Sequence, residues 1–302
     1  MKNKLPNFLI VGAAKSGTSS LYNYLNQHPQ VFMPTYNKDG MKVKEPYFLI
    51  KDVVSNRLHN GVWNWSDYKA LFNDVRDEIA VGEATVLYLY YYKHAIENIK
   101  KRLGNDIKII IILRNPIERA FSAYTHVSRG VKENLSFENA LKIEENRLLN
   151  DHTLTPMVMY KDMGLYSEMV KAYLDNFKNV RVIFYEDFTE NTAKVVEDTL
   201  SFLGVTDIVD LDTDSKYNVG GKRWKSSFLK RFFMQDNPIK KPLRILLPKK
   251  LRIYFRSFVE SVFKKKVLPI SKGTRKALIK FFIKDINKLE ELLNVNLNHW
   301  KR

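Results

Sequence analysis

The sequence contains no cysteine. This excludes disulfides, thiolate-ligated zinc sites, iron–sulfur clusters and cysteine nucleophiles. It also lacks a long hydrophobic run: the longest aliphatic stretch, residues 109–113, is far shorter than the roughly 18 residues that a membrane-spanning helix needs. The first apolar run, residues 8–11, is too short for a secretion signal and leads into a turn rich in glycine and serine. We therefore expect a soluble, cytoplasmic protein without an export signal.

The composition that remains is typical of a globular protein. The chain has 302 residues, 45% of them hydrophobic and 27% charged, which is enough apolar material for a sizeable core. At roughly 150 residues per domain, this length allows one large α/β domain or two small ones. Because no internal repeat and no Gly/Ser linker divides the chain, we expect one domain over residues 1–302.

Positive charge is concentrated in the last third of the chain. Residues 216–302 hold 24 Lys and Arg against 5 Asp and Glu, and the remaining residues hold 26 basic and 28 acidic side chains. The last third of the chain therefore accounts for the whole net charge of +17. Within this basic part, residues 240–266 interleave Lys and Arg with Leu, Ile, Tyr and Phe. Such a segment can lie on an anionic membrane, bind a polyanion or form a solvated helical face, and for a lone basic stretch the solvated face is the simplest interpretation. No nucleic-acid partner is expected, because no zinc-finger or RNP-like pattern accompanies the charge.

Short β-branched or apolar segments alternate along the chain with segments of helical periodicity. The expected strands are 7–11, 31–34, 81–85, 108–113 and 181–185, and the expected helices are 18–27, 95–103, 116–129, 136–149, 166–177 and 276–293. This alternation predicts a single α/β domain, a P-loop-like, mainly parallel sheet with helices on both faces. Past Asp210 the pattern becomes helical and basic.

The first strand is followed by a glycine-rich turn and a helix. That order points main-chain N–H groups and a helix N-terminus at one spot, which makes an anion site. Gly12 and Gly17 keep the spacing of the nucleoside-triphosphate loop, but Thr18 stands where its lysine should be, and Lys15 lies inside the loop. A dinucleotide-binding glycine pattern is absent. An ordinary strand-to-helix turn with helix-capping hydroxyls is the alternative.

A second anion site is expected after the strand 108–113. Arg114 follows the carboxyl end of that strand, where ligands bind in open α/β sheets. Ser122 lies about two turns along the helix that begins at Pro116, so it can face the same crevice, and an arginine with a hydroxyl can grip a phosphate. A salt-bridged arginine and a surface serine are the alternative.

Together the two segments resemble the sulfotransferases that use 3′-phosphoadenosine 5′-phosphosulfate (PAPS). In that family a K-x-G-T-[TS]-[SL] loop holds the 5′-phosphosulfate, and an L-R-[ND]-P-x-x-R-x-x-S-x-Y segment holds the 3′-phosphate. The second pattern is matched by Arg114 and Ser122. The first is matched by Lys15, Ser16, Gly17, Thr18, Ser19 and Ser20. The resemblance covers most of the chain, with Glu186-Asp187 and the closing Leu289…Trp300 pattern also family-like.

The resemblance implies roles for these residues. Lys15 would lie against the bridging oxygen of the phosphosulfate, and the loop N–H groups with the Thr18 and Ser19 hydroxyls would bind the non-bridging oxygens, without a metal ion. Lys222 and Arg223 follow two glycines and resemble the late family segment that closes over the 3′-phosphate, although Gly-Gly-Lys-Arg is also an ordinary basic turn.

A base must also take the proton of the acceptor. Lys44-Glu45-Pro46-Tyr47-Phe48 resembles the K-E-x-x-F-F stretch of the heparan-type branch, which implies Glu45 as the base; a surface glutamate before a bend is the alternative. His126 and His59 are fallback bases, because cytosolic family members use histidine. Heparan-type enzymes often have Glu-Lys-[ST]-Pro where this chain has Glu83-Ala84-Thr85-Val86. We therefore expect a carbohydrate or glycolipid acceptor without inferring heparan itself.

Three other functions are open to a chain of this kind. A nucleotide-dependent kinase needs magnesium and an acidic residue at the end of a core strand, whereas the strand 108–113 ends in Arg-Asn. A metal-dependent glycosyltransferase is suggested by Asp210, Asp212 and Asp214, for which an acidic turn is the simpler interpretation. A non-enzymatic module that binds membranes or polyanions leaves both phosphate motifs unexplained. A PAPS-dependent sulfotransferase is therefore the prediction.

Overall fold

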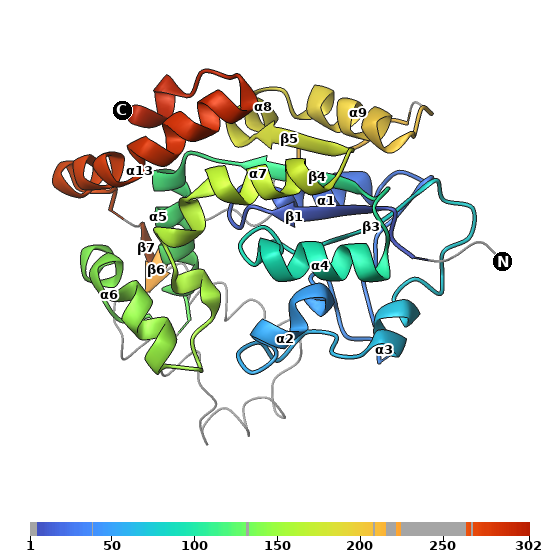
Figure 1. Ribbon diagram of the computed structural model, residues 1–302, viewed down its shortest axis with the longest axis horizontal. Coiled ribbons are helices and arrows are strands. Elements are labelled where there is room, and N and C mark those ends of the chain that lie inside the picture. The colour runs from blue at the N-terminus through green and yellow to red at the C-terminus, as the bar shows by residue number, and fades with distance from the viewer. Residues whose placement is uncertain are drawn as a thin grey trace.

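A parallel β-sheet forms the centre of the protein (Figure 1). The computed structural model describes residues 5–37, 39–130, 133–207, 209–215, 222–224, 264–266 and 268–302. The strand order is β2-β3-β1-β4-β5, with all four pairings parallel. The strands are β1 (Phe8–Gly12), β2 (Val31–Phe32), β3 (Ala80–Ala84), β4 (Lys108–Leu113) and β5 (Val180–Phe184). The predicted α/β class is confirmed, and β4 has the predicted bounds.

Alternate residues of the central strands pack against helices on opposite faces of the sheet. Leu9 and Ile111 point into the larger core, which α4 (Tyr92–Arg102) and α7 (Tyr166–Asn176) cover. Phe8 and Ile110 point into the smaller core, under α1 (Thr18–Leu25) and α9 (Thr192–Leu203). All of β1 and nearly all of β4 are buried, as expected for strands covered on both faces.

Further helices surround this sandwich. They are η1 (Phe48–Ile50), α2 (Lys51–Val54) and α3 (Trp65–Ala70) before β3; α5 (Pro116–Val127), α6 (Phe137–Asn150), η2 (Pro156–Val158) and η3 (Asp162–Gly164) after β4; and α8 (Tyr185–Glu190), α13 (Lys272–Leu293) and η4 (Asn298–Lys301) later in the chain. Asn115 and Ser136 cap α5 and α6 through their side chains, and Pro116 occupies the first turn of α5. The sequence analysis missed α2, α3, α8 and α9.

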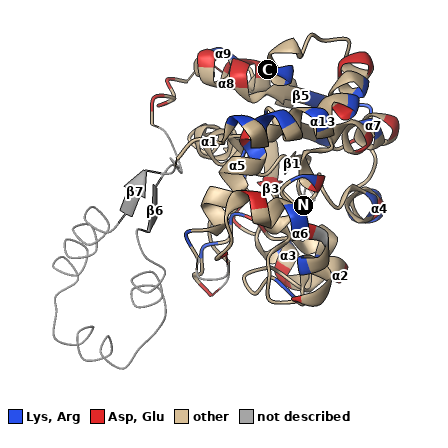
Figure 2. Ribbon diagram, turned by 90° about the vertical axis from the view of Figure 1, so that its left-hand side faces the viewer, with Lys and Arg blue, Asp and Glu red and all other residues tan. Residues whose placement is uncertain are grey.

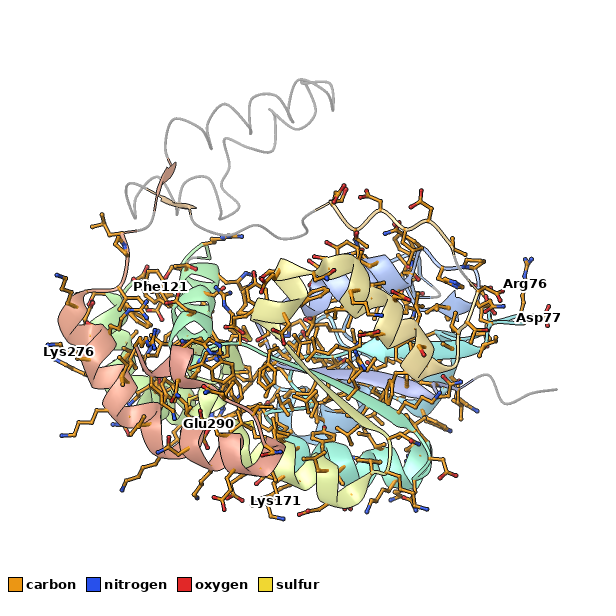
Figure 3. The ribbon with its side chains drawn as sticks, turned by 90° about the horizontal axis from the view of Figure 1, so that it is seen from above. Arg76, Asp77, Phe121, Lys171, Lys276 and Glu290 are labelled. Carbon is orange, nitrogen blue, oxygen red and sulfur yellow. The ribbon has the colours of Figure 1, made fainter. Side chains whose placement is uncertain are left out.

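The last helix packs back onto the sheet domain. The carboxylate of Asp285 on α13 accepts hydrogen bonds from the backbone N–H groups of Tyr166 and Ser167, so it caps the start of α7. Trp300 is fully buried against Tyr166 and Phe184, with ring centres 6.3 and 5.8 Å away. Lys and Arg positions recur along the ribbon of α13 (Figure 2), and Lys276 projects from this helix into solvent (Figure 3). Within the basic last third of the chain, α13 is therefore a helix with a solvated face.

Two short strands, β6 (Lys222–Trp224) and β7 (Lys264–Lys266), pair antiparallel. Most of the segment 240–266 lies outside the described residues, so the membrane contact expected there stays a prediction. In the described part of the chain, no helix combines the length and the apolar character needed to cross a bilayer.

Candidate functional site

The two predicted anion-binding segments meet at the carboxyl edge of the sheet. They follow β1 and β4, which are neighbours in the sheet, with Gly12 paired to Ile111. An Nη1–H of Arg114 donates a hydrogen bond to the carbonyl oxygen of Lys15 across 3.2 Å. The loop after the first strand and the arginine after the fourth therefore form one continuous site.

The loop between β1 and α1 owes its shape to two residues in the left-handed region, Lys15 with φ of 72° and Gly17 with φ of 91°. A Cβ atom at position 17 would lie 3.1 Å from the ring of Phe188 and 3.3 Å from that of Tyr185, which is a tight contact. The positive φ, which side chains other than glycine rarely adopt, is the stronger reason for glycine there. Gly17 is also the N-cap of α1. The loop therefore sets the first turn of α1, with its free N–H groups, at the sheet edge.

One polar atom of this loop is buried without a partner. Ser16 has no exposed surface, and its Oγ makes no hydrogen bond with any described residue. Buried polar groups are normally paired, because an unpaired one costs roughly 1–3 kcal/mol. The exception at this position fits a loop that is completed by a bound anion.

Positive charge converges on the loop. Burial and the neighbouring charges of Arg129, Lys44 and Arg114 lower the pKa of Lys15 to about 8, and Glu45 opposes the shift. Cations held this close repel one another, so a polyanion bound among them would be strongly attracted. The site is therefore electrostatically suited to a phosphate or sulfate group.

The Arg114 side chain is fixed from a second side. Its guanidinium lies 4.5 Å from the ring centre of Tyr185, in a cation–π contact.

The Tyr166 hydroxyl donates to the Arg114 carbonyl at 3.0 Å, and the Asn115 N–H donates to Glu186 at 3.3 Å. The Glu186 carboxylate also accepts a hydrogen bond from the Trp300 indole at 3.2 Å. Tyr185 was not predicted as a site residue, although it directly precedes the family-like Glu186-Asp187 pair.

Of the other residues predicted to bind the donor, Thr18, Ser19, Ser20 and Ser122 lie on the helices that start at this edge. Thr18 is buried, whereas Ser19, Ser20 and Ser122 are partly exposed. Ser122 lies on α5, and its side chain makes no hydrogen bond with any described residue. Lys222 and Arg223 form part of β6, but their side chains lie outside what the structure describes.

Glu45 is linked to the loop through its neighbour. Lys44 Nζ donates to Ser19 Oγ at 2.7 Å and lies 3.4 Å from Glu45 Oε1. The Tyr47 hydroxyl donates to the other Glu45 oxygen at 2.8 Å. The carboxylate is thus held on both sides, close to the anion site. Sequence reasoning did not single out Lys44, although the K-E pair of the motif contained it.

The two fallback histidines have different surroundings. His126 lies on α5. Desolvation, and then the positive charges of Lys15 and Arg129, lower its pKa to about 4, although the residue has an exposed side. It is therefore neutral at pH 7. His59 is exposed in the loop after α2 and makes no hydrogen bond with a described residue of the site.

The segment that departs from the heparan-type pattern at Ala84 and Val86 keeps its glutamate and threonine, and both have a structural role. Glu83, at the end of β3, is fully buried and accepts hydrogen bonds from Tyr68, Thr85 and Tyr88 at 2.7–3.0 Å. Burial raises the pKa of Glu83 to about 7, although the hydrogen bonds from these three donors act to lower it. Thr85 thus supplies one of the donors that this buried carboxyl needs.

The aspartates that suggested a metal site form a turn. The Asp212 carboxylate accepts hydrogen bonds from the N–H groups of Asp214 and Ser215 and from the Ser215 hydroxyl. Among the described residues, no group of three or more histidine, aspartate or glutamate side chains is placed to hold a metal ion. The acidic-turn interpretation of Asp210, Asp212 and Asp214 accounts for these contacts.

Comparison with known proteins identifies relatives over most of the chain. The family model described as sulfotransferase domain matches residues 5–225. Carbohydrate sulfotransferase 15 of Mus musculus is 23% identical over 67% of this chain and 44% of its own length, and the bifunctional heparan sulfate N-deacetylase/N-sulfotransferase 2 of Homo sapiens is 26% identical over 68% of this chain and 22% of its own. The chain thus spans less than half the length of these curated relatives.

A solved structure extends the likeness to nearly the whole chain. The crystal structure of a sulfotransferase from Alicyclobacillus acidocaldarius is 32% identical, with 98% of this chain and 99% of that chain covered and a TM-score of 0.71. The strand-loop-helix at Lys15 and the strand-helix at Arg114 both fall inside the matched region. The chain therefore belongs to the sulfotransferase domain family.

Proposed function

We propose that the protein transfers a sulfuryl group from PAPS to a hydroxyl or amine group of a carbohydrate acceptor. The observation that carries the proposal is the contact between Arg114 and the Lys15 carbonyl, which joins the two anion-binding segments at one sheet edge. A donor with phosphate groups at two positions needs such a double site. Membership of the sulfotransferase family supports the reaction class.

The residues present fit this donor. The first turn of α1 offers main-chain N–H groups, Ser16 Oγ is buried without a partner, and the cations around Lys15 repel one another. We assign the 5′-phosphosulfate to Lys15 and the loop residues 16–20, and the 3′-phosphate to Arg114 and Ser122. Lys222 and Arg223 are proposed to complete the 3′-phosphate site. Bound there, the donor supplies the sulfuryl group and a phosphate leaving group.

Within this assignment, the side chains divide the remaining work. The positive charge of Lys15 stabilises negative charge that develops on the leaving oxygen, as fixed cations do in phosphoryl-transfer sites. Glu45 takes the proton of the acceptor as the acceptor oxygen bonds to sulfur. Its two partners, Lys44 and Tyr47, hold the carboxylate in place for that transfer. His126 and His59 remain alternative bases.

The acceptor class rests on the relatives. These relatives include a carbohydrate sulfotransferase and a bifunctional heparan sulfate N-deacetylase/N-sulfotransferase. For this chain we propose a carbohydrate or glycolipid acceptor. A cytoplasmic location, with peripheral membrane contact through residues 240–266, is the corresponding proposal for its place in the cell.

The test begins with donor binding. Adenosine 3′,5′-bisphosphate should raise the melting temperature of the purified protein in EDTA, because binding to the native state stabilises it. Transfer of labelled sulfate from PAPS is then measured on a panel of polysaccharides, glycolipids and phenols. Stabilisation by ATP-Mg alone would overturn the donor assignment, and activity on phenols alone would overturn the acceptor class.

A further inference from the structure

The closing segment of the chain buries one large side chain among the residues that hold Arg114. Trp300, on η4, has no exposed surface. A buried tryptophan normally pairs its indole N–H, and here that N–H donates a hydrogen bond to Glu186 across 3.2 Å. The proposed roles of the donor and acceptor-base residues leave Trp300 unassigned.

Two contacts of Trp300 lead to the main chain around Arg114. Glu186 Oε1, which accepts the indole N–H, also accepts the backbone N–H of Asn115 at 3.3 Å. The ring centre of Trp300 lies 6.3 Å from that of Tyr166, whose hydroxyl donates to the Arg114 carbonyl at 3.0 Å. The peptide group between Arg114 and Asn115 is therefore held at both its oxygen and its nitrogen by residues that contact the indole.

A third contact leads to the side chain of Arg114. The Trp300 ring packs edge to face on Phe184, at the end of β5, with ring centres 5.8 Å apart. The next residue, Tyr185, places its ring centre 4.5 Å from the Arg114 guanidinium. The backbone of Arg114 and the aromatic ring beside its guanidinium thus both depend on neighbours of one buried tryptophan.

Trp300 is in turn tied to the end of α13. The carboxylate of Glu290 accepts the backbone N–H of Leu297 at 2.6 Å and forms an ion pair with the ammonium group of Lys301. These two contacts lie on either side of Trp300 in the sequence. They fix the closing turn to the helix that precedes it.

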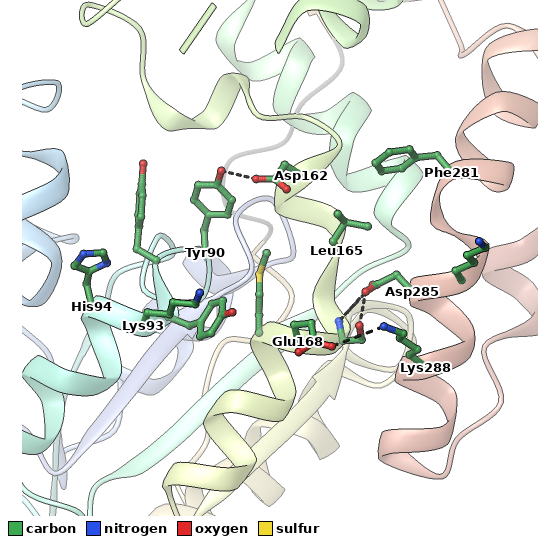
Figure 4. A pocket seen from close by; sticks show the side chains of 14 residues that line it. Tyr90, Lys93, His94, Asp162, Leu165, Glu168, Phe281, Asp285 and Lys288 are labelled. Carbon is green, nitrogen blue, oxygen red and sulfur yellow. Dashed lines mark hydrogen bonds and ion pairs between the residues drawn. The ribbon is translucent and has the colours of Figure 1, made fainter. Parts of the chain in front are cut away.

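The helix α13 is also hydrogen-bonded to the start of α7. Asp285 accepts the hydroxyl of Ser167 (Figure 4), and the same carboxylate accepts the backbone N–H groups of Tyr166 and Ser167. One helix therefore positions both the closing segment and Tyr166, the residue that donates to the Arg114 carbonyl.

We propose that Trp300 is a positioning residue for donor binding: it holds Arg114 in the orientation that receives a phosphate group. Because Trp300 is fully buried, it acts through Tyr166, Phe184 and Glu186 and does not touch the donor. An arginine that is ordered before binding loses less conformational entropy when the phosphate arrives. The proposal rests on the donor assignment made above and deepens it, because it extends the 3′-phosphate site to the end of α13.

A double-mutant cycle in the full-length protein tests this role. Trp300→Phe keeps an aromatic ring in the core and removes the N–H that Glu186 accepts. The calorimetric Kd for adenosine 3′,5′-bisphosphate should rise about three- to tenfold, as expected for the loss of one hydrogen bond. In an Arg114→Ala background the same substitution should leave Kd unchanged, because no guanidinium remains to be positioned.

A matched control makes the same chemical change away from the donor site. Trp65→Phe alters an indole on α3 that stacks on Tyr68 and Phe48, and it should leave Kd unchanged in both backgrounds. Melting temperatures establish that the variants fold. If Trp300→Phe does not fold, Lys301→Ala, which frees the closing turn from Glu290, replaces it in the cycle with the same expected pattern.

Two results would overturn the positioning role. One is a Kd that Trp300→Phe leaves unchanged; the other is a loss of affinity equal in size with and without Arg114, as a general structural role of the tryptophan predicts. Pyrophosphate is titrated in parallel as a second probe. If the wild type binds pyrophosphate with coupling between Trp300 and Arg114 but does not bind the bisphosphate, the donor assignment falls and the positioning role stands. If the bisphosphate binds without that coupling, the positioning role falls and the donor site remains.

Discussion

The guanidinium of Arg114 donates to the main-chain carbonyl of Lys15 across 3.2 Å, although the two residues are 99 positions apart. They meet because β1 and β4 are adjacent parallel strands, and parallel strands end at the same sheet edge. The contact uses the arginine side chain and the lysine backbone. The contact therefore leaves the Lys15 ammonium available to a bound anion. For this reason we expect different roles for the two residues.

Arg114→Ala should weaken donor binding more than turnover. The guanidinium is held by the loop carbonyl and the Tyr185 ring, and its loss removes a charge-assisted contact to phosphate, worth about 1.5–3 kcal/mol or roughly 10- to 150-fold in Kd. Calorimetry with adenosine 3′,5′-bisphosphate measures this change. Arg76→Ala, at an exposed position in the loop before β3, is the matched control and should leave Kd unchanged.

Lys15→Ala should lower kcat by about 10²- to 10³-fold, as removal of one charge-stabilising donor does in other enzymes. Donor affinity should change less, because the loop N–H groups and Arg114 remain. Steady-state kinetics with PAPS, together with the calorimetric Kd, separate the two quantities. The opposite pattern, a large loss in affinity with kcat retained, would contradict the role assigned to Lys15.

Donor affinity should also depend on pH through Lys15. Its pKa is lowered to about 8 by burial and by Arg129, Lys44 and Arg114, so the free site loses this charge above pH 8. A bound anion favours the charged form and raises that pKa, so binding above pH 8 requires proton uptake. Affinity for adenosine 3′,5′-bisphosphate should be steady from pH 6.5 to 7.5 and then fall, and the total loss should not exceed the loss of affinity that Lys15→Ala causes.

Lys15→Arg provides the control for this pH dependence, because arginine keeps its charge throughout the range. Its affinity should stay flat where that of the wild type declines. A decline of equal size in Lys15→Arg would assign the titration to another group.

The parts of the fold that sequence reasoning predicted are those with a strong local signal. β4 consists of five aliphatic residues after a lysine and was placed correctly, and the glycine-bounded loop located Lys15. The helix α9 was missed although Val196, Thr199, Leu200 and Leu203 form a buried stripe at helical spacing, so its signal was present in the sequence. The α/β class did not depend on it.

The partners of the site residues were not predictable in the same way. Tyr185 lies under Arg114 only because β5 pairs with β4, and Lys44 reaches Ser19 only because the chain after β2 returns to the loop. Both contacts depend on tertiary structure and leave no periodicity in the sequence.

Glu45→Gln should lower kcat by about 10²- to 10⁴-fold, the range expected when a general base is removed. The amide keeps the size of the side chain, and its carbonyl oxygen can still accept one of the two hydrogen bonds that Tyr47 and Lys44 donate to separate oxygens of Glu45. Folding and donor binding should therefore be largely preserved. Glu97→Gln on the exposed side of α4 makes the same chemical change outside the site and should leave kcat unchanged.

Tyr47→Phe, which removes only one of the two hydrogen bonds to the Glu45 carboxylate, should lower kcat less than Glu45→Gln does. If Glu45→Gln keeps normal turnover while His126→Ala abolishes it, the base is His126, and the carboxylate held between Lys44 and Tyr47 has only a structural role.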